Sequence, residues 1–274
     1  MSVMTSTAVK TALFAGVLAS GMGIAGASAD DRPAKAFAMV PYSWTGFYVG
    51  GHAAGGSTNV KDAALSWGAG NYLAPGSANA VGVEQTSHKN FNFDQAGGGI
   101  QAGYNYQFGH AVAGIEADLT LLGPGGSTAI TAPYVTSPQS YTIRYAAKID
   151  WLTTIRGRLG YAADRWLMYV TGGVTIADAH FDWSFSDTVP GYGTGSGHKV
   201  LTRPVVGGGF EYALTNNVSA KLEYLYMSLG TISAAGTIRD VPFTGFSNAL
   251  TGQANLSTHL VSFGLNYKFA GAGP

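Results

Sequence analysis

The sequence predicts an all-β fold, an eight-stranded antiparallel up-and-down transmembrane β-barrel. Three observations support this prediction. Eight segments alternate apolar and polar residues with a period of two, which is typical of strands. The segments that join them alternate between short turns and long connections. Aromatic residues gather at the strand ends beside the short turns, where a membrane–water boundary favours amphipathic rings.

The composition agrees with a barrel that crosses a membrane. Of the 274 residues, 40 are glycine, and only 11% are charged, against about 25% in typical soluble domains. No apolar run of about 18 residues follows the N-terminal segment, so no membrane-spanning helix is expected. The net charge of zero gives no support to nucleic-acid binding. Cysteine is absent, which excludes disulfides and thiolate metal sites.

The N-terminal segment resembles an export signal. Lys10 precedes an apolar stretch that ends in Ala27-Ser28-Ala29, and this order of a basic, an apolar and a small-residue region is typical of a secretory signal peptide. We therefore predict a signal peptide over residues 1–29, cleavage before Asp30, and a final location in the cell outer membrane. The remaining divisions that we expect are an N-terminal leader (30–43), the outer-membrane barrel (44–269) and a C-terminal tail (270–274).

Eight strands follow from the alternation, each long enough for a tilted bilayer crossing, which takes about 9 to 11 residues. The fifth is apolar on both faces, so its register stays open. The expected strands are 44–54, 97–108, 111–121, 148–161, 165–177, 203–214, 217–227 and 259–269.

The expected connections alternate in length. Three are short periplasmic turns, at 109–110, 162–165 and 215–217. Four are long extracellular loops, at 55–96, 122–146, 178–202 and 228–258. This asymmetry is typical of outer-membrane barrels. A secreted lipocalin-like barrel or a sandwich would show the same period of two, but its exposed face would not mix glycines with charges of both signs, as the interior of a narrow barrel does.

One belt of aromatic side chains is expected at the membrane boundary near the short turns. Its members are Trp44, Phe47, Phe108, Tyr161, Trp166, Tyr212, Tyr267 and Phe269.

If the apolar face of each strand meets lipid, the charged face lines the lumen. Buried charges are costly unless they are paired, so we expect an ion network in which Glu116 and Asp118 pair with Arg156 and Arg158. Two interpretations stay open: a structural plug, favoured because an eight-stranded lumen is narrow, and a gate for ions or small polar solutes. The expected lumen residues are Glu116, Asp118, Lys148, Asp150, Arg156, Arg158, Arg203, Glu211, Lys221, Glu223 and Lys268.

The segment 148–161 illustrates the predicted orientation of the strands. Its apolar residues Ile149, Trp151, Ile155 and Tyr161 are expected to face lipid, whereas Lys148, Asp150, Arg156 and Arg158 are expected to point into the barrel.

The histidines give no clear metal or haem site. His52 is expected to face inward, and His88, His180 and His198 fall in long loops. No two of them share a ligand spacing, so surface positions are favoured over ligation of haem or a metal. His259 is expected to face lipid without a neighbouring serine and glutamate, which disfavours hydrolysis. We predict no catalytic residue, no metal site and no cofactor.

Four segments resemble a known family: "WTGFYVGGHAAGG", "GIEADLT", "WLTTIRGRLGYAADRWLMYVTGG" and "VSFGLNYKF". They are similar to strands of the Omp25/Omp31-like outer-membrane proteins of alphaproteobacteria, also described as porin-family or outer-membrane immunogenic proteins. The resemblance extends over residues 44–269. It implies a barrel of the small OmpA type, with roles in envelope structure, surface exposure and antigenicity, sometimes adhesion or haem binding, and small-solute passage.

One departure from the family concerns the C-terminus. Family chains commonly end on an aromatic residue that the barrel-assembly machinery recognises, whereas Phe269 is followed here by "AGAGP". The expected partners are outer-membrane lipid, that machinery during insertion, and host or cell-surface ligands of the loops. No nucleic acid is expected, and the oligomeric state stays open.

The sequence therefore predicts a non-enzymatic structural and surface barrel with a charge-plugged lumen and exposed antigenic loops. A narrow porin-like channel for ions or small polar solutes is the first alternative. An adhesin or haem-binding surface protein is the second.

Overall fold

The computed structural model describes residues 42–241 and 245–269. The predicted signal peptide (1–29), all but the last two residues of the predicted leader (30–43) and the predicted tail (270–274) lie outside these residues.

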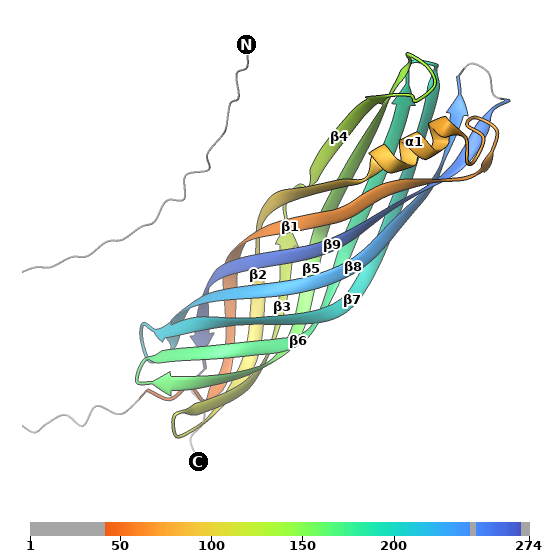
Figure 1. Ribbon diagram of the computed structural model, residues 1–274. Helices are drawn as coiled ribbons and strands as arrows, with labels where there is room; N and C mark the ends of the chain where they lie inside the picture. Colours follow the sequence, from red (N-terminus) through yellow and green to blue (C-terminus); the bar gives the residue numbers. More distant parts are fainter. Residues whose placement is uncertain (1–41, 242–244, 270–274) are drawn as a thin grey trace, which may run out of the picture. The chain divides into compact units, whose positions relative to one another are not determined.

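The described residues form nine strands and one helix (Figure 1). In chain order these are β1 (Gly46–Gly70), α1 (Ala78–Ser87), β2 (Lys89–Phe108), β3 (Ala111–Leu122), β4 (Gly126–Pro133), β5 (Ser140–Ala163), β6 (Trp166–Asp187), β7 (Gly191–Ala213), β8 (Val218–Asp240) and β9 (Ser247–Lys268).

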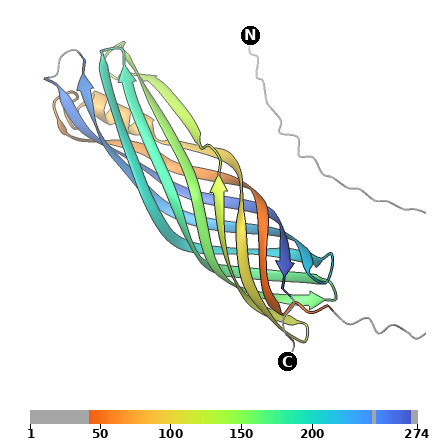
Figure 2. The same ribbon diagram turned by 180° about the vertical axis from the view of Figure 1, so that it is seen from behind.

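The strands close into a ring of eight positions (Figures 1 and 2). Neighbours pair antiparallel in the order β3-β2-β1-β9-β8-β7-β6-β5, and β3 pairs again with β5 to complete the circle. β4 also pairs with β5, beyond a break at residues 123–125, so β3 and β4 together occupy one position. The predicted eight-stranded antiparallel barrel is confirmed. Closure through β3 leaves no unpaired edge in the half nearest the short turns, as a membrane-embedded sheet requires. Among the described strands, β4 pairs with β5 alone.

The two ends of the barrel differ in their connections. At the turn end, residues 109–110, 164–165 and 214–217 join consecutive strands. Gly109 and Asp164 have φ angles of 61° and 50°, and such left-handed residues are typical of tight hairpin turns. At the opposite, distal end the connections are 71–88, which contains α1, and 134–139, 188–190 and 241–246.

Most strands are longer than predicted. β1, β5, β6, β7, β8 and β9 contain 25, 24, 22, 23, 23 and 22 residues, about twice the length of a bilayer crossing. The segments predicted as long loops are therefore largely strand, and only residues 188–190 separate β6 from β7. These extensions were not predicted, because strands were expected to turn their apolar face outward to lipid. In the extensions the apolar residues face the inside of the barrel.

β6 shows this reversal without any break in its alternation. In the half nearest the short turns, called the proximal half below, Met168 and Val170 face outward and are exposed. In the distal half, Phe181 and Trp183 face inward and are buried, while Asp182 faces outward. The proximal half is thus apolar outside, and the distal half is apolar inside.

In β5 the reversal requires a β-bulge. The register with β6 shifts between Ile149 and Leu152, and an extra residue exchanges the two faces of a strand. Ile149 is 0% exposed, so the prediction that it faces lipid was wrong. Lys148 and Asp150, predicted inside the lumen, lie on the outer face, with side chains 45% and 39% exposed.

The inward side chains of the distal half form one apolar cluster, called the distal core. It includes Ile143, Tyr145, Phe181, Trp183, Phe185 and Ile232. Burial of each large apolar side chain stabilises the fold by about 1.5–3 kcal/mol. The Trp183 indole Nε1 also donates a hydrogen bond to the Ala234 carbonyl at 2.8 Å, so its polar atom is satisfied.

α1 covers part of the distal core. Ser77 caps its N-terminus by accepting a hydrogen bond from the Ala80 backbone N–H at 3.3 Å. Val83 is buried in the distal core, and Tyr145 donates from Oη to the Ser87 carbonyl at 3.0 Å. In the part of the chain that the structure describes, no helix is long and apolar enough to span a membrane.

Seven of the eight residues of the predicted aromatic belt lie on the outer face near the turn end: Phe47, Phe108, Tyr161, Trp166, Tyr212, Tyr267 and Phe269. Trp44 was wrongly assigned to this belt. Its side chain is 2% exposed and packs inside the barrel mouth with Val112, Ala162 and Leu167. Trp44 and Tyr48 are four residues apart, so in a period of two both side chains point to the same, inward face.

Candidate functional site: the barrel lumen

The proximal lumen holds a cluster of buried polar and charged side chains, called the lumen network. Every one of the eight ring positions contributes to it. Its members are Tyr48, Asn105, Glu116, Asp118, Thr154, Arg156, Arg158, Tyr169, Glu211, Ser219, Lys221, Glu223 and Asn266.

Glu116 on β3 lies at the centre of the lumen network. Its Oε1 accepts from Arg156 Nη2 at 2.7 Å and from Lys221 Nζ at 2.9 Å. Its Oε2 accepts from Tyr48 Oη at 2.7 Å, and Arg158 Nη1 lies 3.4 Å away. One carboxylate therefore joins β1, β3, β5 and β8, strands that are far apart in the sequence.

Arg156 connects two further acids of the lumen network, Asp118 and Glu223. Its Nη2 lies 2.8 Å from Asp118 Oδ2, and its Nη1 lies 3.0 Å from Glu223 Oε1. Its Nε donates to Thr154 Oγ1 at 2.8 Å, and that hydroxyl donates to Asp118. The guanidinium is thus surrounded by carboxylates and a hydroxyl, and its side chain is only 1% exposed. Such pairing offsets the cost of removing these charges from water.

Arg158 is two residues nearer the turn end of β5 than Arg156. Its guanidinium carbon is 4.7 Å from the centre of the Tyr48 ring and 5.3 Å from that of Tyr169, distances at which aromatic faces attract a cation. Its Nε donates to Asn105 Oδ1 at 2.7 Å, and its Nη1 lies 3.4 Å from Glu211 Oε2. Glu211 in turn accepts from Ser219 and from Asn266, which closes the network across the ring.

The structure brings together seven of the eleven predicted lumen charges: Glu116, Asp118, Arg156, Arg158, Glu211, Lys221 and Glu223. Glu116 pairs with both arginines as expected, since β3 and β5 are neighbours with Glu116 directly opposite Arg156. Asp118 contacts Arg156 and not Arg158, because Thr154 is the residue opposite it.

Four predicted lumen charges lie elsewhere. Lys148 and Asp150 pair with each other on the outer face beyond the β5 bulge, with Nζ 2.9 Å from Oδ2. Arg203 donates to the backbone carbonyls of Leu229 and Thr202. It therefore links β7 to β8 through the backbone and does not pair with a carboxylate. Lys268 lies at the turn end, where its ammonium donates to the Ser43 carbonyl over the Tyr42 ring.

The neutral members of the network were not predicted as site residues. Tyr48, Asn105 and Asn266 have the same inward parity as the predicted charges, so the alternation could have revealed them. Tyr169 could not be found in this way, because its strand is apolar on both faces. Gly103 makes room for Tyr48, since a Cβ at Gly103 would lie 2.2 Å from the Tyr48 Oη.

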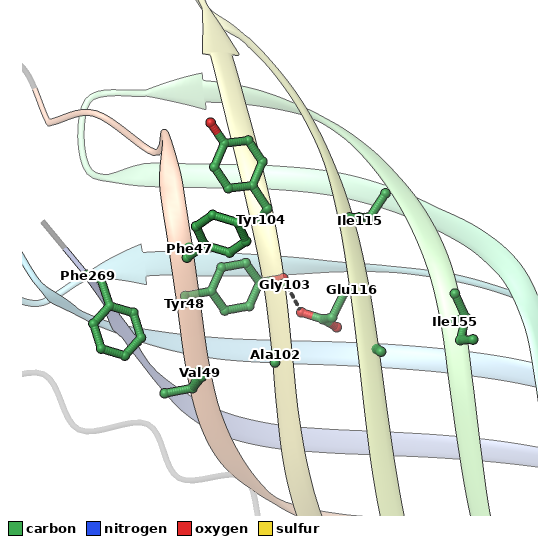
Figure 3. A pocket seen from close by; sticks show the side chains of 11 residues that line it. Phe47, Tyr48, Val49, Ala102, Gly103, Tyr104, Ile115, Glu116, Ile155 and Phe269 are labelled. Carbon is green, nitrogen blue, oxygen red and sulfur yellow. Dashed lines mark hydrogen bonds between the residues drawn. The ribbon is translucent and has the colours of Figure 1, made fainter. Parts of the chain in front are cut away.

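The wall in front of Tyr48 and Glu116 is hollowed on the outer side of the barrel (Figure 3). This hollow of about 390 Å³ is lined outward by Phe47, Tyr104, Ile155 and Phe269, over small residues such as Ala102. Its lining is apolar and it lies within the aromatic and aliphatic band that faces lipid.

Above the network, the distal half has no fully buried charged residue among those that the structure describes. Hydroxyl pairs such as Thr58 and Thr258, whose oxygens are 3.0 Å apart, mark the transition. Beyond them the distal core fills the lumen with buried aliphatic and aromatic side chains. An ionic layer and an apolar layer therefore lie in series along the barrel.

Comparison with known proteins agrees with this architecture. Residues 15–269 match the family model described as the outer membrane protein beta-barrel domain. The chain belongs to this family. It is an outer-membrane β-barrel protein.

Two relatives cover most of the chain. The 31 kDa outer-membrane immunogenic protein of Brucella melitensis is 28% identical over 232 residues, 83% of this chain and 85% of that protein. The 22 kDa outer membrane protein of Rhizobium leguminosarum is 30% identical over 230 residues, 78% of this chain and 83% of that protein.

Two solved barrels are also similar to this chain. The attachment invasion locus protein Ail of Yersinia pestis has a TM-score of 0.37 at 11% identity and covers 82% of this chain and 99% of its own. Neisserial surface protein A has a TM-score of 0.39 at 13% identity and covers 82% of this chain and 98% of its own.

Proposed function

We propose that this outer-membrane barrel is a non-enzymatic structural and surface protein whose lumen is closed and whose distal half is displayed outside the cell. The observation that carries the proposal is the arrangement of two buried layers in series, the lumen network and the distal core.

The lumen network supports a plug. An eight-stranded barrel has an interior only just wide enough for its side chains, and here these side chains bond one another across the lumen. A polar solute would have to separate Arg156 from Glu116, Asp118 and Glu223 and leave these charges unpaired, which costs several kcal/mol. It would then meet the distal core, whose side chains are mainly aliphatic and aromatic.

Planar-bilayer recording tests the plug against the alternative of a narrow channel. The wild-type barrel is expected to give no steady conductance. Arg156→Ala is expected to stay closed as well, because the distal core still lies in series with the opened network. Frequent, stable openings of the wild-type protein that change in ion selectivity with Glu116→Gln would contradict the plug and favour the channel.

Surface display is supported by the distal half. Its outer face carries polar side chains such as Asp182, Ser184 and Ser196, so it is suited to water beyond the bilayer. The name of the Brucella relatives, outer-membrane immunogenic protein, supports the further proposal that antibodies recognise this half. Binding of host or cell-surface ligands, or of haem, would also involve these distal connections and can be tested by whole-cell binding after their replacement.

Epitope tags test the display. A tag inserted between Val189 and Pro190, in the distal connection, is expected to bind antibody on intact cells. A matched tag between Asp164 and Arg165, in a short turn, is expected to bind only after the outer membrane is permeabilised. Labelling of the second tag on intact cells would reverse the proposed orientation.

A catalytic role is not proposed. His259, the histidine considered for hydrolysis, lies on the outer face of β9, where its Nδ1 is 2.7 Å from Tyr224 Oη. The His259 ring also lies against the rings of Tyr224 and Tyr226. Such a group of amphipathic rings is typical of a membrane–water boundary.

A further inference from the structure

The outer face of β6 and β7 carries a polar cluster just beyond the apolar band. Asp178 and His180 lie two residues apart on β6, and His198 lies on β7 directly opposite His180. One ligand atom from each of the three lies within 4.8 Å of the other two. The cluster takes no part in the lumen network, because its side chains point out of the barrel.

The separations within this cluster suit a shared cation. His198 Nε2 lies 2.5 Å from Asp178 Oδ1, and His180 Nε2 lies 3.7 Å from the same oxygen. The two imidazole rings are stacked, with centroids 4.5 Å apart and planes 20° apart. A tetrahedral ion with bonds of about 2.0–2.2 Å holds neighbouring ligand atoms roughly 3.3 Å apart. Small side-chain rotations would therefore bring all three atoms to one ion.

The β5 bulge adds a fourth group. It turns Asp150 to the outer face, where Asp150 Oδ2 lies 3.1 Å from His180 Nε2. Lys148 is the cation that faces this group, with its Nζ 2.9 Å from the same Asp150 oxygen. An ion bound here would compete with Lys148 for Asp150.

We propose that Asp178, His180 and His198 form a binding site for a divalent transition-metal ion, with Asp150 as the fourth ligand. Two imidazoles and carboxylates suit Zn²⁺ or Cu²⁺, whereas Mg²⁺ and Ca²⁺ prefer oxygen ligands alone. The ion would tie β5, β6 and β7 together where the barrel leaves the membrane. The site does not depend on whether the lumen is closed.

Calorimetric titration of the folded, full-length barrel in detergent micelles with zinc chloride tests the site. We expect saturable binding of one ion, and a loss of affinity of at least tenfold in His198→Ala and in His180→Ala. His88→Ala is the matched control, because His88 is an exposed histidine away from the cluster, and its affinity should equal that of the wild type. A gel-mobility difference between boiled and unboiled samples verifies that each variant is folded.

Two further measurements sharpen the assignment. Lys148→Met is expected to tighten zinc binding several-fold, because it removes the cation that competes for Asp150; an unchanged affinity would overturn Asp150 as a ligand. Electron paramagnetic resonance of the Cu²⁺-loaded barrel is expected to show coupling to two imidazole nitrogens, reduced to one in His198→Ala. Absence of saturable zinc binding to the wild type, or equal affinity in His198→Ala, would overturn the site and leave only a histidine–aspartate hydrogen bond.

Discussion

The proximal and distal halves of this barrel are built from the same strands with opposite polarity. In the proximal half, the outer face is apolar and the interior is ionic, as Val170 and Arg158 show. In the distal half, the outer face is polar and the interior is apolar, as Asp182 and Phe181 show. This difference fits the proposed surroundings, with lipid around the proximal half and water around the distal half. Pairing of β3 with both β2 and β5 closes the hydrogen-bonded ring in the proximal half.

The two halves also differ in how their interiors stabilise the fold. The distal core gains free energy from apolar burial, as the core of a soluble protein does. The lumen network gains little net free energy from its pairs, but the loss of one partner leaves an uncompensated buried charge. The proximal half should therefore be the more sensitive to removal of a single charge.

The largest effect is expected from Arg156→Ala. It leaves the carboxylates of Glu116, Asp118 and Glu223 without their shared cation, so the free energy of unfolding should fall by about 3–5 kcal/mol. The matched control is Arg144→Ala, on the same strand β5 but exposed on the distal outer face, which should change it by less than about 0.5 kcal/mol. Urea unfolding of the refolded barrel in micelles, followed by tryptophan fluorescence, measures both. Equal effects of the two variants would deny any special cost to the network.

A new charge on the outer face should separate the two halves more directly. Val170→Arg places a cation in the lipid-facing band of β6 and should cost about 2–4 kcal/mol if the site lies near the bilayer midplane. Ser184→Arg, on the same face of the same strand in the distal half, should cost nearly nothing, because water solvates the new charge. Refolding into lipid vesicles and urea unfolding compare them. Similar losses would show that the distal outer face is not in water.

A smaller effect tests how the polarity reverses along β8. The register with β9 shifts between Ser228 and Gly230, and Gly230 has a φ of 75°. An alanine in this left-handed conformation should cost about 1–2 kcal/mol. Gly55→Ala is the control, because a Cβ at Gly55 meets nothing within 4 Å, and it should be neutral or stabilise by up to about 1 kcal/mol. If Gly230→Ala were as stable as the wild type, the bulge would not depend on glycine.

Much of the proximal half could be predicted because each strand there keeps one apolar outer face and one polar inner face. Alternation of period two gave the ring of eight strands and the short turns, and it placed Glu116 and Arg156 inside. The pairing of these two residues followed from the adjacency of their strands. Local patterns are sufficient wherever a contact joins neighbouring strands with an unbroken register.

The errors arise where the pattern changes meaning along a strand. One extra residue in β5 moved Ile149 inside and Asp150 outside, and no local signal marks that bulge. Lys221 reaches Glu116 across the lumen, a contact that depends on closure of the ring and not on adjacency. His180 and His198 meet because β6 and β7 continue as a hairpin through a segment predicted as loop, so spacing along the chain could not pair them.

The smallest expected effect is a change of stability with pH, caused by two tyrosines at the distal end. Tyr72 and Tyr134 each donate from Oη to Asp187 Oδ2 at 2.5 Å, which joins two distal connections to the end of β6. Burial raises the pKa of both tyrosines above the usual value of about 10, and the bonds to Asp187 raise it further. The folded state therefore holds these protons more tightly than the unfolded chain, so their stabilisation is present below about pH 10 and is lost as pH rises above it. The stability advantage of the wild type over the double variant Tyr72→Phe/Tyr134→Phe should shrink between about pH 9 and about pH 11. Urea unfolding at the two pH values measures this change, and an advantage that stays constant would place the tyrosine–aspartate bonds outside the cooperative unit that unfolds.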